Sequence, residues 1–227
     1  MMTAGSVAVT LALAGCSGGD TPTPDGPPIT TAMMQAGVLQ PVDIGSTWRA
    51  PSQPPPTTSV MALCAGLASR PPLPGKPSVI ASSLADEGDK GAQAFDQLGL
   101  VYPDATSADA AIVALHATAT ACPPNASRSA GPREDTAEAG YTETSTIQDL
   151  VSGQWSGFVV LRHKVYEPST PGTADTAVAV LARNNALVVA SYAVYWVGQH
   201  STGPEFTTDW RRLVGTVLSR VDAKRSS

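Results

Sequence analysis

The sequence predicts an α+β fold, in which an antiparallel sheet of about five to six strands carries two main helices and one disulfide bond. Residues 175–183 and 186–197 are rich in β-branched and aromatic residues, and the Asn184-Asn185 pair between them suits a tight hairpin turn. Two other segments repeat apolar residues at helical spacing. These segments are 104–122 and 207–225.

The chain begins with a short apolar leader that ends in Leu13-Ala14-Gly15-Cys16. This stretch resembles a bacterial lipobox, which implies that residues 1–15 are a lipoprotein signal peptide and that Cys16 becomes the lipidated first residue. The alternative is that residues 1–15 form an ordinary buried segment. The leader is too short to span a bilayer, which needs about 20 apolar residues.

The expected organisation after the leader is a tether followed by one domain. Residues 16–28 consist mainly of turn-forming and polar residues, so we expect a disordered tether after lipidated Cys16. Residues 29–227 are long enough for a single domain with its own core. Acyl chains on Cys16 would hold this domain at the extracytoplasmic face of the cell membrane.

Two cysteines remain once Cys16 carries lipid. In an oxidising compartment, Cys64 and Cys122 are expected to form one disulfide bond. The alternatives are two buried thiols or a redox-active pair, although redox pairs usually lie close together as Cys-x-x-Cys. The helical stripe of residues 104–122 places Cys122 on its buried face, which also favours a structural disulfide.

The first third of the chain is dominated by proline, since 13 of the 20 prolines lie at or before residue 77. We therefore expect regular sheet only beyond that point. Before it, the pattern predicts short helices at 32–39 and 59–68, separated by an extended segment at 41–45. After it, residues 78–84 and 92–102 are expected to form a hairpin.

The rest of the chain is expected to alternate between a loop and long strands. Residues 125–140 are polar and contain turn-forming residues, which predicts a loop. Strands are then expected at about 141–149 and 154–167, ahead of the 175–197 hairpin and the final helix.

Composition argues against several classes of function. The chain has 14 Lys and Arg against 19 Asp and Glu, a formal net charge of -5, so nucleic acid is not an expected partner. The three histidines, His116, His163 and His200, have no zinc-type spacing. His163, between Arg162 and Lys164, is expected on a solvent-facing edge. No catalytic residue, metal site or cofactor is predicted.

Aromatic residues are scarce, at 5% of the chain, and several fall on the last strands. Each is most simply a core residue, but as a group they could line a groove that binds an apolar ligand or a peptide. The candidate ligand-binding residues are Trp155, Tyr166, Tyr192, Tyr195 and Trp196.

Several features together resemble actinobacterial sensor-domain lipoproteins of the PknH extracellular type. They are the lipobox, the Cys64-Ala65-Gly66 segment, the strand ending at Val101-Tyr102 before an alanine-rich helix, and the terminal strand-turn-strand-helix. The resemblance covers roughly residues 40–222 and implies an antiparallel sheet with helices packed on it. The kinase sensor domain is similar but has two disulfides, whereas this chain can form only one, which leaves the loop at 125–140 less constrained.

The predicted function is therefore a lipid-anchored extracytoplasmic domain of the cell envelope that senses a ligand or binds a protein. An alternative is a carrier of an apolar envelope ligand, such as a lipid or glycolipid. A hydrolase is a third hypothesis, and it would require His163 or His200 to meet a serine and a carboxylate within hydrogen-bond reach.

Overall fold

The fold is taken from a computed structural model of the whole chain. It describes residues 26–51, 60–64, 71–86, 92–129, 139–168, 171–198, 202 and 204–226. The predicted signal peptide, Cys16 and most of the predicted tether lie outside these residues, as does His200.

The centre of the fold is an antiparallel sheet, to which the described residues contribute eight strands in the order β1-β2-β3-β8-β7-β6-β5-β4. Because β3 pairs with β8, the first hairpin of the sheet lies beside the last one. The strands are β1 (Trp48–Arg49), β2 (Ser78–Asp86), β3 (Gln93–Val101), β4 (Asn125–Arg128), β5 (Tyr141–Ser152), β6 (Trp155–Tyr166), β7 (Gly172–Arg183) and β8 (Ala186–Val197).

The prediction of five to six strands was too low. The six long strands are present, and two short strands, β1 and β4, extend the sheet at its edges. β1 has two residues and β4 has four, too few to show the alternating pattern that identifies a strand from sequence. They become strands by pairing with β2 and β5, so tertiary contact determines them.

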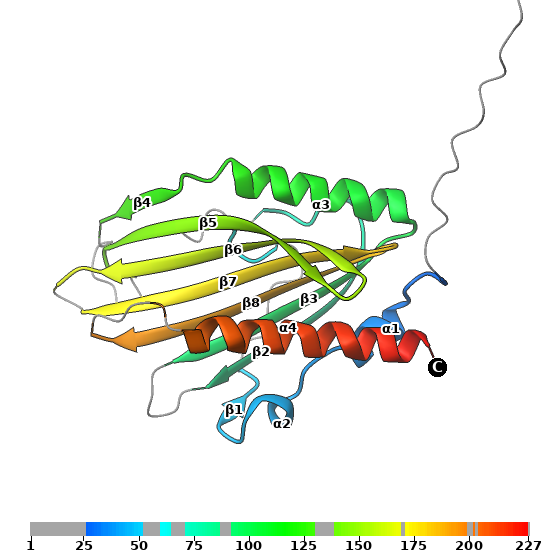
Figure 1. Cartoon of the computed structure of the whole chain (residues 1–227), viewed down its shortest axis with the longest axis horizontal. Helices are drawn as coiled ribbons and strands as arrows, with labels where there is room; N and C mark the ends of the chain where they lie inside the picture. The colour runs from blue at the N-terminus through cyan, green and yellow to red at the C-terminus, as the bar shows by residue number, and fades with distance from the viewer. Residues whose placement is uncertain are drawn as a thin grey trace, which may run out of the picture.

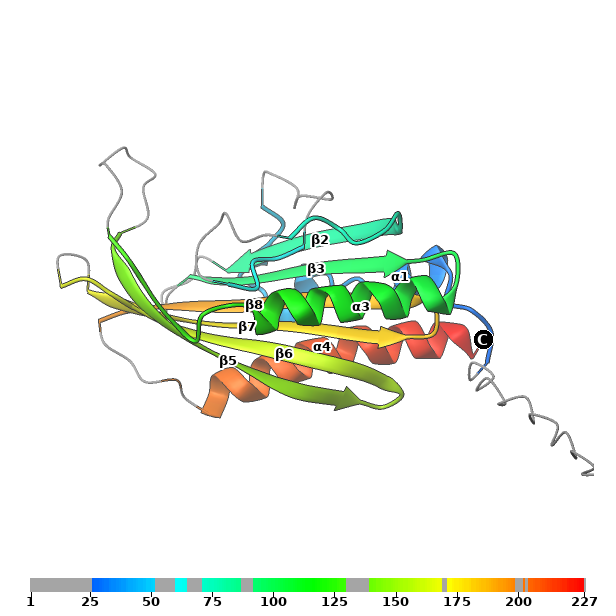
Figure 2. The same cartoon turned by 90° about the horizontal axis from the view of Figure 1, so that it is seen from above.

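Four helices in the described part of the chain lie against this sheet. They are α1 (Thr31–Ala36), α2 (Pro41–Ile44), α3 (Ala105–Thr120) and α4 (Pro204–Arg225). The two long helices cover opposite faces, with α3 on one side and α4 on the other, as Figures 1 and 2 show. α2 replaces the extended segment predicted at 41–45, since Pro41 suits the first turn of a helix and the Asp43 carboxylate accepts from the Gln40 N–H.

A further correction concerns the helix predicted at 59–68. The described part of that segment, residues 60–64, is not helical. Part of the predicted loop at 125–140 is instead strand β4.

The core consists of two layers, one on each face of the sheet. In β8 the side chains of Val188, Ala190 and Tyr192 join the layer under α4, which we call the α4-side cluster. Leu187 and Val189 join the layer under α3, the α3-side cluster. This alternation explains why β8 is apolar along almost its whole length, as expected of a central strand covered on both faces.

The hairpin between β7 and β8 turns at the predicted asparagine pair. Asn184 adopts a positive φ of 47°. Asn185 has another role, because its buried amide accepts from the Ile29 N–H at 2.8 Å and donates to the carbonyls of Ile29 at 3.0 Å and Tyr102 at 2.9 Å. One side chain thus holds the start of the domain and the end of β3 beside this turn.

The predicted disulfide is present between Cys64 and Cys122, with the two Cα atoms 5.5 Å apart. Cys122 follows the end of α3, whereas Cys64 belongs to the irregular segment at 60–64. Val60 and Leu63 of that segment are fully buried in the α3-side cluster. The disulfide therefore attaches a segment without regular structure to the helix that covers it.

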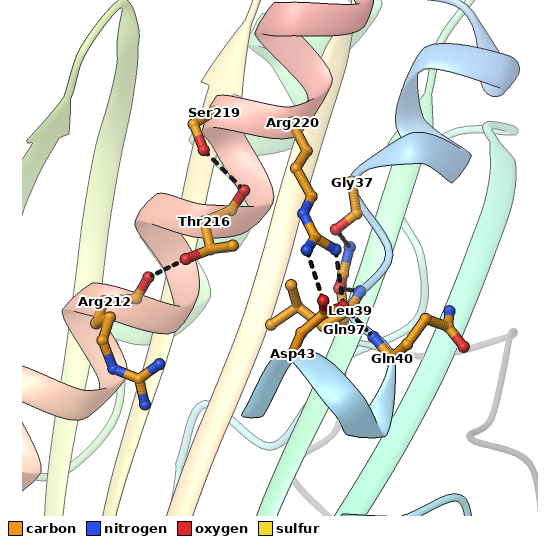
Figure 3. Close-up of polar contacts among 9 residues, drawn as sticks. All are labelled: Gly37, Leu39, Gln40, Asp43, Gln97, Arg212, Thr216, Ser219 and Arg220. Atoms are coloured by element: carbon orange, nitrogen blue, oxygen red, sulfur yellow. Dashed lines mark hydrogen bonds and ion pairs between the residues drawn. The ribbon is translucent and has the colours of Figure 1, made fainter. Parts of the chain in front are cut away.

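On the opposite face, an ion pair fastens α2 to α4. Arg220 donates from Nη1 to Asp43 Oδ2 at 2.8 Å and from Nη2 to Asp43 Oδ1 at 2.6 Å (Figure 3). Close by, Gln97 of β3 reaches the backbone of Gly37 and Leu39. The hydrogen bonds from Arg220 hold the pKa of the Asp43 carboxyl below its ordinary value of 3.8.

Asp43→Asn should lower stability slightly at neutral pH, and the effect should disappear in acid. Because the pKa of Asp43 is lower in the folded state, its contribution is complete above the unfolded pKa of about 3.9 and is lost as the pH falls through the folded value. The pair is partly exposed, so the loss at pH 7 should be less than about 1 kcal/mol. Denaturant unfolding from pH 7 to pH 2 measures it.

Asp209→Asn is the matched control, since it removes a carboxylate from an exposed i,i+3 pair with Arg212 near the other end of α4. This control should show a smaller difference from the parent at pH 7. A difference for Asp43→Asn that is as large at pH 2 as at pH 7 would contradict the linkage.

Candidate functional site

A pocket of about 640 Å³ opens where α4 ends. Four segments that are distant in sequence contribute to it: the first described residues, the β5–β6 turn, the end of β7 and the end of α4. The lining residues are Gly26, Pro27, Gln154, Arg183, Asp222, Arg225 and Ser226. In Figure 1 this end of the molecule is on the right, beside the mark for the carboxyl terminus.

The floor of the pocket contains a polar contact between sheet and helix. Arg183 Nη1 of β7 donates to Asp222 Oδ1 of α4 at 2.5 Å, and Trp155 Nε1 of β6 donates to the same atom at 3.1 Å. The Arg183 side chain is 11% exposed and that of Asp222 is 32% exposed. Asp222 therefore ties together two strands and the helix.

The rim of the pocket joins the two ends of the described chain. Arg225 Nε donates to the Pro27 carbonyl at 2.9 Å. A Cβ atom on Gly26, whose φ is 81°, would lie 2.8 Å from Arg225 Nη2, so glycine suits this position both for its backbone and for its lack of a side chain. The guanidinium of Arg225 thus packs directly on the incoming chain.

The lining of the pocket is polar and formally positive. Two guanidinium groups, Arg183 and Arg225, face one carboxylate, Asp222, although the chain as a whole has a net charge of -5. Gln154 adds an amide, whereas the Ser226 hydroxyl donates to the Asp222 carbonyl at 3.1 Å. Such a set of donors is suited to a small anion or to a polar group rich in oxygen atoms.

The predicted aromatic site residues do not gather at this pocket, nor at one common site. Trp155, Tyr192 and Trp196 lie on the α4 side of the sheet. Tyr166 and Tyr195 lie on the α3 side, where their rings meet edge to face with centroids 5.6 Å apart. The sheet itself separates the two sets.

The three aromatic residues on the α4 side pack as part of the core. Trp155 is 0% exposed and Tyr192 is 3% exposed. Tyr192 stacks on Phe206 of α4 and donates its hydroxyl to Gln93, and burial raises the pKa of that hydroxyl. Trp196 is partly buried against the same cluster. Trp155 contributes to the pocket only through its hydrogen bond to Asp222.

A polar cluster surrounds His163, one of the two histidines on which the hydrolase hypothesis depends. Its Nδ1 lies 2.8 Å from Oδ1 of Asp175, which is 1% exposed, and Thr202 Oγ1 donates to the same oxygen at 2.5 Å. His163 is therefore not on the solvent-facing edge predicted for it, because β6 is an interior strand and the imidazole is only 30% exposed.

This cluster does not have the geometry of a catalytic triad. In a catalytic triad the carboxylate and the hydroxyl occupy opposite nitrogens of the imidazole. Here the contacts to Asp175 and Thr202 are both made at Nδ1 of His163. Within the described ranges, no group of three or more His, Cys, Asp and Glu residues could hold a metal ion.

Sequence reasoning also missed a buried ion pair between neighbouring strands. Arg162 of β6 donates to Glu143 of β5 from Nε at 2.7 Å and from Nη2 at 2.8 Å, and it donates from Nη1 to the Ala62 carbonyl at 3.0 Å. A signal did exist, since Arg162 shares a strand face with the buried residues Phe158 and Val160. A charge in register with core residues should have indicated a buried partner.

Comparison with known proteins shows a structural likeness. No family model matches the sequence, and no curated protein matches it. Among solved structures, the fold is similar to that of the extracellular domain of PknH from Mycobacterium tuberculosis, with a TM-score of 0.54 and 14% identity. The alignment covers 87% of this chain and 98% of that one. This likeness establishes a PknH-like fold.

Across the residues that the structure describes, no helix is long and apolar enough to cross a membrane.

Proposed function

We propose that this chain is a lipid-anchored, extracytoplasmic domain of the cell envelope that senses a ligand or binds a protein. The observation that carries the proposal is its likeness to the extracellular domain of PknH over nearly the whole of both chains. The lipobox-like stretch ending at Cys16 supplies the anchor in this proposal, and no catalytic role is included.

The disulfide supports an extracytoplasmic location. Cys64 and Cys122 are 58 residues apart in sequence, and their bond attaches a segment with little structure of its own to α3. Such structural disulfides persist in oxidising compartments and are rare in the cytosol.

The polar pocket favours sensing or protein interaction over transport of an apolar ligand. A carrier needs a cavity lined mainly by apolar side chains. The pocket at the end of α4 is instead lined by arginine, aspartate, glutamine and serine. Trp155 and Tyr192, which were candidates for an apolar groove, are packed beneath α4.

The anchor is tested by Cys16→Ser in the full chain, expressed in a mycobacterial host. The parent should fractionate with membranes, and mass spectrometry should find a diacylglyceryl group on an amino-terminal Cys16. The variant should retain its leader and carry no lipid, because the thiol that accepts the lipid is gone. Cys64→Ser is the matched control and should still be lipidated. An unmodified Cys16 in the parent would refute the anchor.

The binding role is tested by native mass spectrometry of the parent protein purified from those membranes. A specific small molecule or protein that remains associated would support the proposal. A domain that retains neither after mild detergent extraction and chemical cross-linking would count against it.

A further inference from the structure

We propose that the pocket at the end of α4 binds a phosphate group. In a membrane, this phosphate would belong to the headgroup of an anionic phospholipid. For that ligand the inference rests on the proposed function, which places the domain at a membrane. Free phosphate offers the same chemistry, so the two sources are separated experimentally below.

The first argument is the set of donors that the pocket presents. Guanidinium groups bind phosphate through paired N–H donors, and Arg183 and Arg225 enter the pocket from different elements. Asp222 offsets one of these charges through its contact with Arg183 Nη1. With two arginines and one aspartate, the lining residues together carry a formal positive charge, and the Gln154 amide can donate to further phosphate oxygens. The Ser226 hydroxyl is not a free donor, because it donates to the Asp222 carbonyl at 3.1 Å.

The second argument concerns the end of α4. The carboxyl end of a helix carries partial negative charge, which by itself disfavours an anion. The last turn of α4 contains Lys224 and Arg225, which compensate for that charge. The site therefore depends on its side chains, and the loss of one guanidinium should weaken binding strongly.

The third argument is position relative to the anchor. Gly26 lines the pocket and lies ten residues after Cys16, a distance that an extended chain spans in about 35 Å. A lipid on Cys16 would keep this pocket within that distance of the bilayer, whatever conformation the intervening residues adopt. The far end of α4 can lie farther from the bilayer than the pocket does, because this helix extends about 33 Å away from the pocket.

The test uses the full chain with Cys16→Ser, so that no acyl chain is attached. The probes are inorganic phosphate, followed by NMR of the arginine side chains, and phosphatidylcholine vesicles with or without phosphatidylglycerol, followed by flotation. Arg225→Gln should weaken binding at least about fivefold, equivalent to about 1 kcal/mol. Arg212→Gln, which removes an exposed charge near the other end of α4, should change it less than about twofold.

A gain-of-function variant provides a second test. Gln154 is exposed on the β5–β6 turn, so Gln154→Lys should be accepted by the fold and should strengthen binding of the same probes. This result would hold even if Arg225→Gln disturbed the contact with Pro27.

The outcomes separate the two phosphate sources. Binding of both inorganic phosphate and phosphatidylglycerol vesicles through Arg225 supports a lipid headgroup, whereas binding of inorganic phosphate alone supports a soluble phosphate ligand. The proposal is overturned if neither probe binds, or if Arg212→Gln weakens binding as much as Arg225→Gln. Because the test does not require lipidation, a failure of the Cys16 anchor would not be mistaken for a failure of the pocket.

Discussion

Cys64→Ser and Cys122→Ser should each lower the free energy of unfolding by about 4 kcal/mol, the loop-closure entropy expected for cysteines 58 residues apart. Without the disulfide, Val60 and Leu63 must be held in the α3-side cluster by packing alone. The double variant should be no less stable than either single one, because both remove the same bond. Urea unfolding of all three variants measures these losses.

Cys16→Ser serves as the control for thiol removal, and it should leave the unfolding free energy of the domain unchanged. Reduction of the parent with dithiothreitol should reproduce the loss seen in the variants. Losses that add up in the double variant would show that the two side chains stabilise the protein separately, contrary to the disulfide.

Arg162→Met should cost about 3–5 kcal/mol, since it leaves the carboxylate of Glu143 buried without its partner. The side chains of Arg162 and Glu143 are 7% and 2% exposed, so water cannot replace the lost contacts. The Ala62 carbonyl also loses its donor. Thermal and denaturant unfolding should both report the loss.

A double variant separates the ion pair from simple packing. Arg162→Met combined with Glu143→Leu removes both charges and should recover most of the stability, because a buried pair contributes little more than apolar residues of similar size. Arg212→Met, in the exposed pair with Asp209, should cost less than about 0.5 kcal/mol. A double variant as unstable as Arg162→Met alone would contradict this account.

Local pattern predicted the long elements of the fold. The apolar stripes of α3 and α4 and the turn between β7 and β8 were visible in the sequence because each element must bury one face or provide one turn conformation. β1 and β4 were not predicted, since strands of two and four residues exist only through pairing with β2 and β5.

The aromatic residues show how far sequence reasoning could have gone. Tyr192 and Trp196 differ by an even number of positions in β8, whereas Tyr195 falls between them. The strand period of two therefore already placed Tyr195 on the opposite face from the other two. The pocket was beyond this kind of reasoning, because Arg183, Asp222 and Gly26 come together only through the tertiary fold.

The contact between Pro27 and Arg225 also indicates how the chain of this domain could be circularly permuted. The first and last described segments lie within hydrogen-bond distance, so a short peptide could link them without crossing the sheet. New termini could then be opened at Gly153, which has a positive φ of 60° and nothing within 4 Å of where a Cβ would lie. A circularly permuted chain of this kind should keep the sheet order, and its new termini would lie beside Gln154, at the same end of the molecule as the pocket.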